Sequence, residues 1–356
     1  MRIVLYTIFI GLIGYGNLSA QDVLLQNINE HITSLNPALL HLSDYQYKIG
    51  INHREAVNLT RSSGLSTPSA ITPNRISSVY GQTTMPLSTV DFLSMELRIL
   101  DDNPAGAIIA RTDISSSFNY SRLLSDNGSS RQRLSFGTSI GLDLIRLTDT
   151  EFWFGSQYDR LEQRVDLGIP SGEVTLIDLT NRANVDVSLG LNWIYEIDRT
   201  GSYYLGAALH HLNAYNQAIF RGSTVPIERR LTLTAGLRRF ISSKVTWANT
   251  AIYQNQGVFQ SLALRSTIHY VIDSFGDDTV ALGIMPVIQD GLEGTSLTGV
   301  NILASFVSND ISLNISYELS AGRITEFTDG RGTIEFGLSY MLNKIGNTNT
   351  AKNWLY

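Results

Sequence analysis

Histidine and acidic side chains are the residues of this sequence that could bind a metal ion or transfer a proton. The six histidines are His31, His41, His53, His210, His211 and His269. A metal site needs several ligands at a short spacing on one face, and none of the six has a carboxylate or a second histidine placed in that way. His210 and His211 are adjacent on a predicted strand, so we expect their side chains to point to opposite faces. We therefore interpret the histidines as polar residues near strand ends, and we predict no metal site.

Two acidic clusters, Asp101-Asp102-Asn103 and Asp277-Asp278, offer oxygen ligands for a cation. Each lies between two predicted strands, where Asp and Asn are common in solvated turns, so we interpret both as turns. The sequence has no nucleophile elbow, no phosphate-binding loop and no cysteine. Asn58-Leu59-Thr60 matches a glycosylation acceptor, to which we assign no function. We expect no catalytic residue, no cofactor and no enzymatic activity.

The elements that position these side chains are strands, and residues 185–212 show the pattern most clearly. Apolar residues alternate with small or polar ones along 185–197, and Ile194 is the single exception. The alternation resumes along 202–212, and residues 198–201 supply the turn. A period of two predicts two strands of a hairpin. Each limb has about ten residues, which is enough for a tilted strand to cross a bilayer.

The same alternation recurs through the chain and predicts about fourteen strands. Charged residues make up only 16% of the sequence, against about a quarter in a typical soluble domain. No apolar run reaches the ~18 residues of a membrane-spanning helix, so a membrane protein of this composition must close a barrel. We predict an all-β, transmembrane antiparallel β-barrel over residues 45–342, with strands at 45–54, 75–86, 93–100, 114–123, 134–143, 185–197, 202–212, 231–241, 244–253, 261–270, 279–287, 298–307, 311–319 and 333–342.

The lengths of the predicted connections indicate which end of the barrel faces outward. With a periplasmic N-terminus, long extracellular loops would lie at 55–74, 101–113, 144–184, 213–228, 254–260, 288–297 and 320–332. Short periplasmic turns would lie between them, with 271–278 the one turn that is not shorter than both neighbouring loops. A soluble secreted β-domain is the alternative, and it gives no reason for such an ordering. The polar face then lines the lumen, where we expect the charges of Glu96, Arg98, Arg238, Arg265 and Glu335 to pair or to tune what passes.

The two ends of the chain have patterns of their own. Residues 1–20 read as a signal peptide, with a basic Arg2 followed by an apolar run and small residues before Gln21. Residues 21–44 lack the period of two, and we expect them to be a plug or a periplasmic segment. Residues 343–356 form a C-terminal tail. We predict export to the outer membrane, with membrane lipid as a partner, and a net charge of −6 gives no basic surface for nucleic acid.

Several short motifs, in order along the chain, resemble those of the PorP/SprF family of outer-membrane proteins of Bacteroidetes type IX secretion and gliding systems. They are Gln26, Asn36-Pro37-Ala38, Tyr47 and Arg54; Asp102-Asn103-Pro104-Ala105-Gly106; Tyr203-Tyr204-Leu205-Gly206 with His211-Leu212; Ile315-Ser316-Tyr317-Glu318; and the closing segment from Gly332 to Tyr340. The chain departs from the family pattern at Glu55-Ala56, Glu318 and Thr333, where the family commonly has Trp, Asp and His.

The resemblance implies an accessory barrel that assists the secretion or surface attachment of cargo proteins (adhesins) carrying a C-terminal sorting domain, together with other type IX secretion components. It implies no catalytic residues. The cargo would bind in the barrel lumen or at the long outer loops, above all 144–184 with its aromatic residues. The alternative is a diffusion channel or small-molecule transporter, because fourteen strands enclose a lumen wide enough for solutes unless it is plugged.

Overall fold

The computed structural model describes residues 27–42, 45–57, 74–104, 109–147, 155–159, 164–166, 168, 181–197, 200–218, 222–272, 278–291, 294–322 and 332–344. The predicted signal peptide at 1–20, the Asn58-Leu59-Thr60 motif, Asp277 and the tail beyond residue 344 lie outside the described residues.

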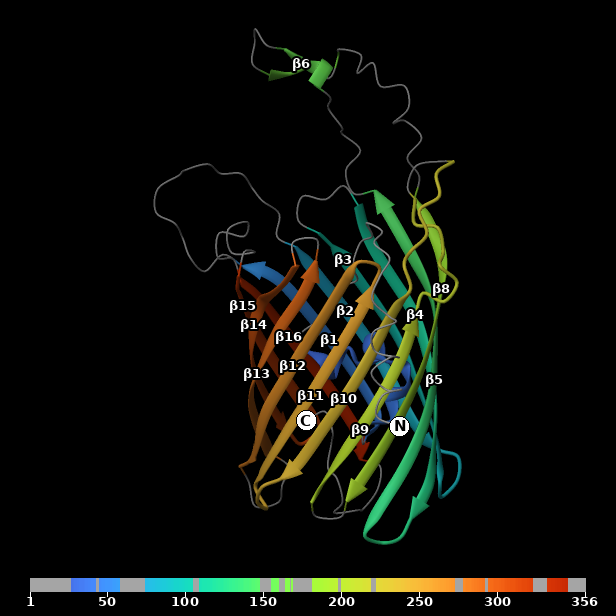
Figure 1. Cartoon of the computed structure of the whole chain (residues 1–356), viewed down its shortest axis with the longest axis vertical. Coiled ribbons are helices and arrows are strands. Elements are labelled where there is room, and N and C mark those ends of the chain that lie inside the picture. Colours follow the sequence, from blue (N-terminus) through green and yellow to red (C-terminus); the bar gives the residue numbers. More distant parts are fainter. Residues whose placement is uncertain are drawn as a thin grey trace, which may run out of the picture.

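Fourteen strands of the described residues form one closed antiparallel barrel, which confirms the predicted architecture (Figure 1). Each barrel strand pairs with its sequence neighbours, and β1 pairs with β16 to close the ring. The strands are β1 (Tyr45–Val57), β2 (Arg75–Pro86), β3 (Asp91–Asn103), β4 (Ile109–Asp126), β5 (Ser130–Leu147), β8 (Arg182–Ile197), β9 (Gly201–His210), β10 (Arg230–Phe240), β11 (Val245–Gln256), β12 (Phe259–Val271), β13 (Asp278–Gly291), β14 (Gly294–Ser308), β15 (Ile311–Ser320) and β16 (Gly332–Lys344).

The barrel faces are the reverse of those of a soluble protein. Ile49, Leu205 and Leu282 on the outer wall are 60%, 57% and 68% exposed, whereas polar residues such as Asn52 and Asn192 are buried inside. A bilayer is the solvent that makes this arrangement favourable, because apolar side chains then face hydrocarbon. Among the described residues, no helix has the length and apolarity needed to cross a membrane.

Several strands extend beyond their predicted ends. β4 and β5 have 18 residues each, and β3 continues through Asp101-Asp102-Asn103, which was predicted as a turn. The cluster stays in the strand because Asp101 accepts hydrogen bonds from Thr112 and Arg146 on the two following strands, at 2.6 Å each. The predicted loops 254–260 and 288–297 are also largely strand, since β12 begins at Phe259 and β14 at Gly294. Most of these rim residues are polar or glycine, so hydrophobic alternation alone did not reveal them.

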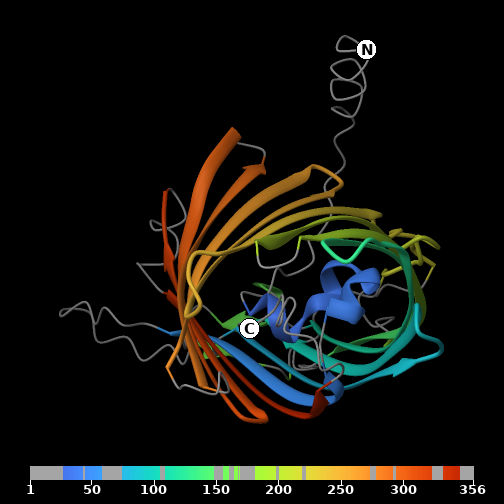
Figure 2. The same ribbon diagram turned by 90° about the horizontal axis from the view of Figure 1, so that it is seen from below.

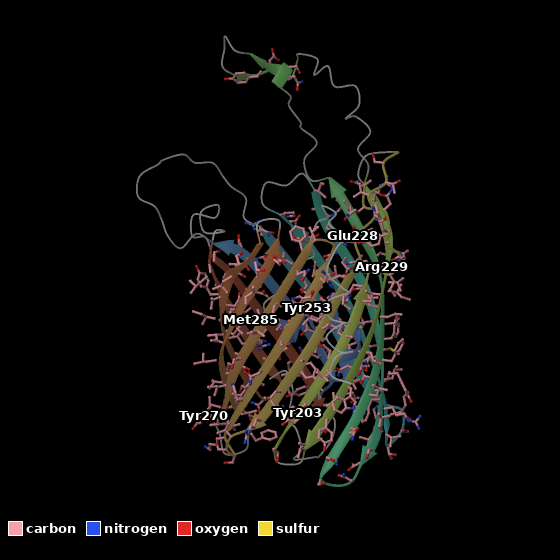
Figure 3. The ribbon with its side chains drawn as sticks, viewed as in Figure 1. Tyr203, Glu228, Arg229, Tyr253, Tyr270 and Met285 are labelled. Carbon is pink, nitrogen blue, oxygen red and sulfur yellow. The ribbon has the colours of Figure 1, made fainter. Side chains whose placement is uncertain are left out.

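Aromatic side chains mark the end of the barrel opposite the long connections 58–74, 148–181, 211–229 and 321–331. Tyr203 and Tyr270 lie near that end (Figure 3). Other outward aromatic residues within a few positions of the same strand ends are Tyr47, Trp193, Tyr195, Trp247, Phe306 and Tyr340. Aromatic rings collect at the interface between lipid headgroups and hydrocarbon, so this band places the periplasmic interface at the end with the short turns.

Residues 27–42, hereafter the lumen segment, lie inside the barrel (Figure 2). The segment consists of a 3-10 turn η1 (Ile28–Glu30), one turn of helix α2 (Ile32–Leu35) and a second 3-10 segment η2 (Pro37–Leu42). Almost every one of its residues is buried. A separate short hairpin, β6 (Tyr158–Asp159) with β7 (Arg164–Val165), lies beyond the extracellular end (Figure 1).

The orientation predicts which turns can be labelled from outside the cell. A Ser223→Cys variant, in the extracellular connection 211–229, should react with a membrane-impermeant maleimide on intact cells. A Ser129→Cys variant, between β4 and β5, should react only after the outer membrane is opened. The native chain has no cysteine, so it supplies the unlabelled control. Labelling of Ser129→Cys on intact cells would reverse the orientation.

Candidate functional site: the lumen segment and the chamber above it

A buried ion pair anchors the first turn of the lumen segment to the barrel wall. Lys48 Nζ on β1 lies 3.4 Å from Glu30 Oε2, and the two side chains are 1% and 0% exposed. Lys48 Nζ also donates a 3.0 Å hydrogen bond to the Asn29 carbonyl. Asn314 Nδ2 donates to Glu30 Oε1 at 2.7 Å, and the Tyr80 hydroxyl donates to Glu30 Oε2. The carboxylate is thus fully satisfied, as a buried charge requires.

A second buried carboxylate comes from the wall. Glu335 on β16 accepts hydrogen bonds from the Asn27 backbone N–H at 3.0 Å and from Asn52 Nδ2 at 2.9 Å. Asn27 Nδ2 donates to Asn52 Oδ1 at 3.1 Å. On β12, Arg265 donates to Asn29 Oδ1 at 3.0 Å. Wall strands far apart in the sequence therefore converge on residues 27–30.

The Asn36-Pro37-Ala38 turn fits against glycines of the opposite wall. Asn36 Nδ2 donates to the carbonyl oxygens of Leu191 at 3.0 Å and Ala207 at 3.3 Å, and Asn36 Oδ1 accepts from the Ala38 N–H at 2.8 Å. A Cβ atom added at Gly137 would overlap the backbone of Pro37 and Ala38. One added at Gly190 would overlap the Asn36 side chain. The wall needs glycine at these inward positions because the turn approaches its backbone directly.

Apolar contacts complete the fit and explain the one irregular residue of the sequence pattern. Ile194 is 3% exposed and belongs to a buried cluster with Ile32, Leu39, Leu42 and Tyr204. It therefore faces the lumen, where the segment replaces water. A second cluster joins the lumen segment to the strands β11 to β14 through Ile28, Leu35, Ile252, Ala263, Met285, Val287 and Leu303.

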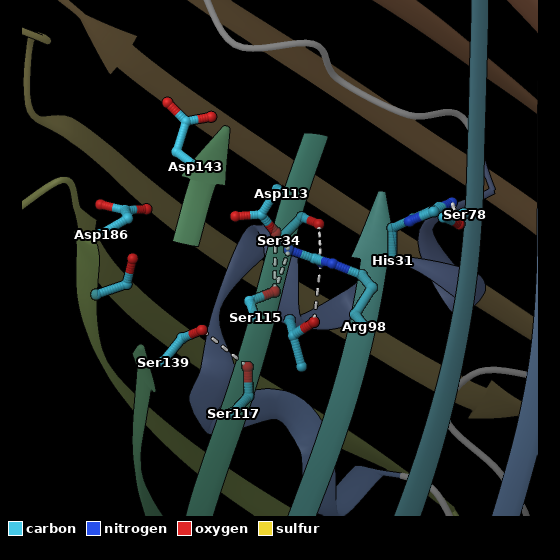
Figure 4. Close-up of polar contacts among 12 residues, drawn as sticks. His31, Ser34, Ser78, Arg98, Asp113, Ser115, Ser117, Ser139, Asp143 and Asp186 are labelled. Atoms are coloured by element: carbon cyan, nitrogen blue, oxygen red, sulfur yellow. Dashed lines mark hydrogen bonds and ion pairs between the residues drawn. The ribbon is translucent and has the colours of Figure 1, made fainter. Parts of the chain in front are cut away.

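A polar chamber of about 140 Å³ lies between the lumen segment and the wall strands β2–β5 and β8–β10. Arg98 on β3 connects the two: its guanidinium donates to Thr33 Oγ1 at 3.1 Å and to the Ser34 hydroxyl, and it pairs with Asp113 at 3.3 Å (Figure 4). Glu96 accepts a hydrogen bond from Thr33. Arg230 donates to the Ser34 carbonyl at 2.7 Å.

The extracellular connection 211–229 folds over this chamber. Arg111 donates to Asp143 and to the Tyr215 hydroxyl, and His211 Nδ1 lies 3.0 Å from Asp186 Oδ1. Burial raises the pKa of the Tyr215 hydroxyl above its ordinary value, so the hydroxyl stays protonated at neutral pH. Asn216 bonds to the backbone of three residues of the same connection, Ser223, Ala218 and Val225. The described parts of this connection, residues 211–218 and 222–229, are therefore joined to each other at the mouth of the barrel.

The prediction that the side chains of His210 and His211 point to opposite faces is wrong. Both side chains line the chamber, and their ring centroids are 6.4 Å apart. β9 ends at His210, and His211 adopts a φ of 56°, a left-handed conformation that turns its side chain to the same side. His210 lies within 3.0 Å of the Leu35 carbonyl, so it contacts the lumen segment.

The remaining predicted polar residues are dispersed. His31 and His41 belong to the lumen segment, His53 lies on the outer wall beside Ser77 at 2.9 Å, and His269 lies 3.0 Å from Thr267. Four of the five inward charges, Glu96, Arg98, Arg265 and Glu335, bind the lumen segment, while Arg238 lies over the Phe240 ring. Asp278 accepts a 2.6 Å hydrogen bond from Ser308. Sequence reasoning did not identify Lys48, Asn52 or Asn314 as anchors, although each is a polar residue of a predicted strand.

The site is suited to binding a polypeptide. Its donors and acceptors pair with backbone carbonyls, amides and side chains of a short peptide, and glycines leave room for that peptide's backbone. Within the described parts of the chain, no group of three or more His, Asp and Glu side chains is arranged to hold a metal ion.

Residues 18–340 match the family model described as type IX secretion system membrane protein PorP/SprF. No curated protein matches the chain significantly in sequence. Among solved structures, the toluene transporter TodX of Pseudomonas putida aligns with 11% identity and a TM-score of 0.48, covering 93% of this chain and 96% of its own. The toluene transporter TbuX of Ralstonia pickettii aligns with 9% identity and a TM-score of 0.48, covering 89% and 95%. CdiB from Escherichia coli aligns with 13% identity and a TM-score of 0.43, covering 82% and 62%.

The buried Glu30–Lys48 pair predicts a large loss of stability when its cation is removed. Lys48→Met should lower the free energy of unfolding by about 3–5 kcal/mol, because Glu30 then remains buried without a cation. Urea titration of the barrel refolded into vesicles measures this. The exposed Lys244→Met is the matched control, with an expected change within about 0.5 kcal/mol. The double variant Glu30→Gln with Lys48→Met should recover part of the loss, and equal stability of Lys48→Met and Lys244→Met would contradict the assignment.

Proposed function

Because this chain belongs to the PorP/SprF family of type IX secretion system membrane proteins, we propose that it holds secreted cargo proteins at the outer face of the membrane. In this proposal the barrel is an accessory component that assists the secretion or surface attachment of a cargo protein with a C-terminal sorting domain. The cargo binds at the extracellular end, and other secretion components contact the barrel as well.

The occupancy of the lumen is the observation that carries this proposal. The lumen segment is held to the inner wall by buried contacts, such as that of Glu30 with Lys48 and that of Asn36 with the Leu191 carbonyl. A partner as large as a protein therefore has the loops at the mouth as its binding surface, not the barrel interior.

Two parts of that mouth support a protein-binding role. The connection 211–229 is held in shape by Asn216 and presents Val225, which is 48% exposed. The β6–β7 hairpin lies beyond the end of the barrel (Figure 1) and includes Tyr158, whose residue exposure is 42%. Exposed tyrosines at loops are frequent anchors of protein interfaces because they combine a large apolar ring with a polar tip.

A pull-down from the native outer membrane tests the proposal. A tag placed after Tyr356 and a mild detergent should recover a secreted protein with a C-terminal sorting domain, or other secretion components. Replacing residues 155–166 by a Gly-Ser linker should abolish recovery of the cargo while the barrel stays folded, because that change removes the hairpin. The same linker in the periplasmic turn 242–244 is the control. Cargo recovery that survives the hairpin replacement would place the binding surface elsewhere.

A diffusion channel is the second candidate, favoured by the width of a fourteen-stranded barrel and by the chamber above the lumen segment. Planar-bilayer recordings separate the two candidates. The native barrel should show little steady current, because the lumen segment occupies its interior. Gly137→Val should open it by displacing Pro37 and Ala38, whereas Gly81→Val should not, since a Cβ at Gly81 meets nothing within 4 Å. A large steady current through the native protein would favour the channel.

A further inference from the structure

The outer wall of the barrel carries a hollow of about 720 Å³ across strands β8 to β12. Strand pairing places its outward residues in lateral rows. One row is Leu205–Ala235–Ala251–Leu264, and the next row toward the periplasmic end is Tyr203–Leu237–Asn249–Ser266. In the first row, the long side chains of leucine lie on β9 and β12, and the alanines of β10 and β11 between them have only methyl groups. A groove therefore lies over β10 and β11 at this row, within a span of three strand spacings, or about 14 Å, and Leu237 and Asn249 border it on the periplasmic side.

One edge of the groove is aromatic. Trp193 and Tyr195 stack with ring centroids 6.0 Å apart and an interplanar angle of 6°. Tyr203 beside them is 44% exposed and lies in the band of aromatic residues near the periplasmic end (Figure 3). The groove thus begins at the level of the periplasmic membrane interface and continues toward the middle of the membrane.

Polarity changes along the groove in the order in which a phospholipid changes along its length. The floor near the membrane centre is Ala235 and Ala251. The next row holds Leu237 and Asn249, whose Nδ2 is buried, and Ser266, which accepts a 3.0 Å hydrogen bond from Trp247 Nε1. The row closest to the periplasm pairs Trp247 with Arg239, which is exposed on the same outer face.

We infer that this groove binds one phospholipid of the periplasmic leaflet. The acyl chains lie over Ala235 and Ala251, between the longer side chains of Leu205 and Leu264, and the phosphate pairs with the exposed Arg239 guanidinium. A phospholipid is favoured over a protein partner because the order of apolar, aromatic and cationic side chains follows the membrane normal.

Native mass spectrometry of the barrel tests this inference. The native protein, released from vesicles of palmitoyl-oleoyl phosphatidylethanolamine in mild detergent, should retain one lipid. Filling the floor with Ala235→Phe and Ala251→Phe should remove that adduct. Ala304→Phe is the matched control, because Ala304 is an exposed residue on the outer face of β14 away from the groove. Equal lipid retention by the double variant and Ala304→Phe would overturn the inference.

Arg239→Gln gives an independent measurement that leaves the groove floor intact. The substitution should lower lipid retention about fivefold, the effect of one surface cation near an anionic group. Vesicles of phosphatidylglycerol should give the same fivefold difference between the native protein and Arg239→Gln, because phosphatidylglycerol and phosphatidylethanolamine both carry a phosphate. Equal lipid retention by Arg239→Gln and the native protein would show that Arg239 does not contact the phosphate. A photoreactive residue placed at position 251 gives a further check in native membranes, where a crosslink to a protein would show that the groove binds a protein partner and not a lipid.

Discussion

The docking of the lumen segment against the inner wall is the constraint on which the rest of this structure depends. Glu30 and Lys48 would each be costly to bury alone, and they are stable together only because Tyr80, Asn314 and the Asn29 carbonyl satisfy their remaining groups. These partners come from β1, β2 and β15, so the ion pair also fixes how those strands are placed around the segment. The interior of this barrel is therefore a packed core of polar and apolar contacts, and its shape is set by the peptide within it.

This constraint accounts for inward residues that a water-filled lumen would not require. Gly137, Gly190 and Gly206 lie where a side chain would meet the Asn36-Pro37-Ala38 turn. Gly337 is inward as well, and a Cβ there would lie 2.9 Å from Glu30 Cγ. A lumen adapted only to water tolerates any small polar residue at such positions. Glycine at these four positions indicates that the wall and the segment fit each other as two surfaces of one core.

The sequence predicted the strands well because the bilayer imposes a strict alternation on each of them. Period two identified the strands, and residues of the apolar sets that it separates, such as Ile49 and Leu205, face the lipid in the structure. It failed at the rims, where Asp101 and its neighbours continue β3 through polar contacts that lack any hydrophobic period. It also failed at His211, whose positive φ is a backbone property that residue type does not reveal.

The position of the lumen segment against the wall could not be predicted from the sequence, for a different reason. Asn27 and Glu335 are separated by 308 positions, and Asn36 and Leu191 by 155, so no local pattern connects them. The one local signal was Ile194, an apolar residue on a polar face. In an otherwise regular strand, an apolar residue on the lumen side indicates that it packs against other apolar residues and not against water. Here those residues are Ile32 and Leu39 of the lumen segment.

The wall formed by β9 to β12 shows how the inner and outer faces of one sheet constrain each other. On the inside, the Tyr204 ring covers Gly236, where any Cβ would overlap it, and Tyr204 in turn packs against the lumen segment. On the outside, the row adjoining Gly236 is reduced to Ala235 and Ala251, so the hollow lies where the sheet has little side-chain volume. Gly236 has no side chain to pack on the lumen side, and the Tyr204 ring fills that space. Binding of the segment and the shape of the lipid-facing surface therefore rest on the same few residues, and a change at Tyr204 or Gly236 affects both faces.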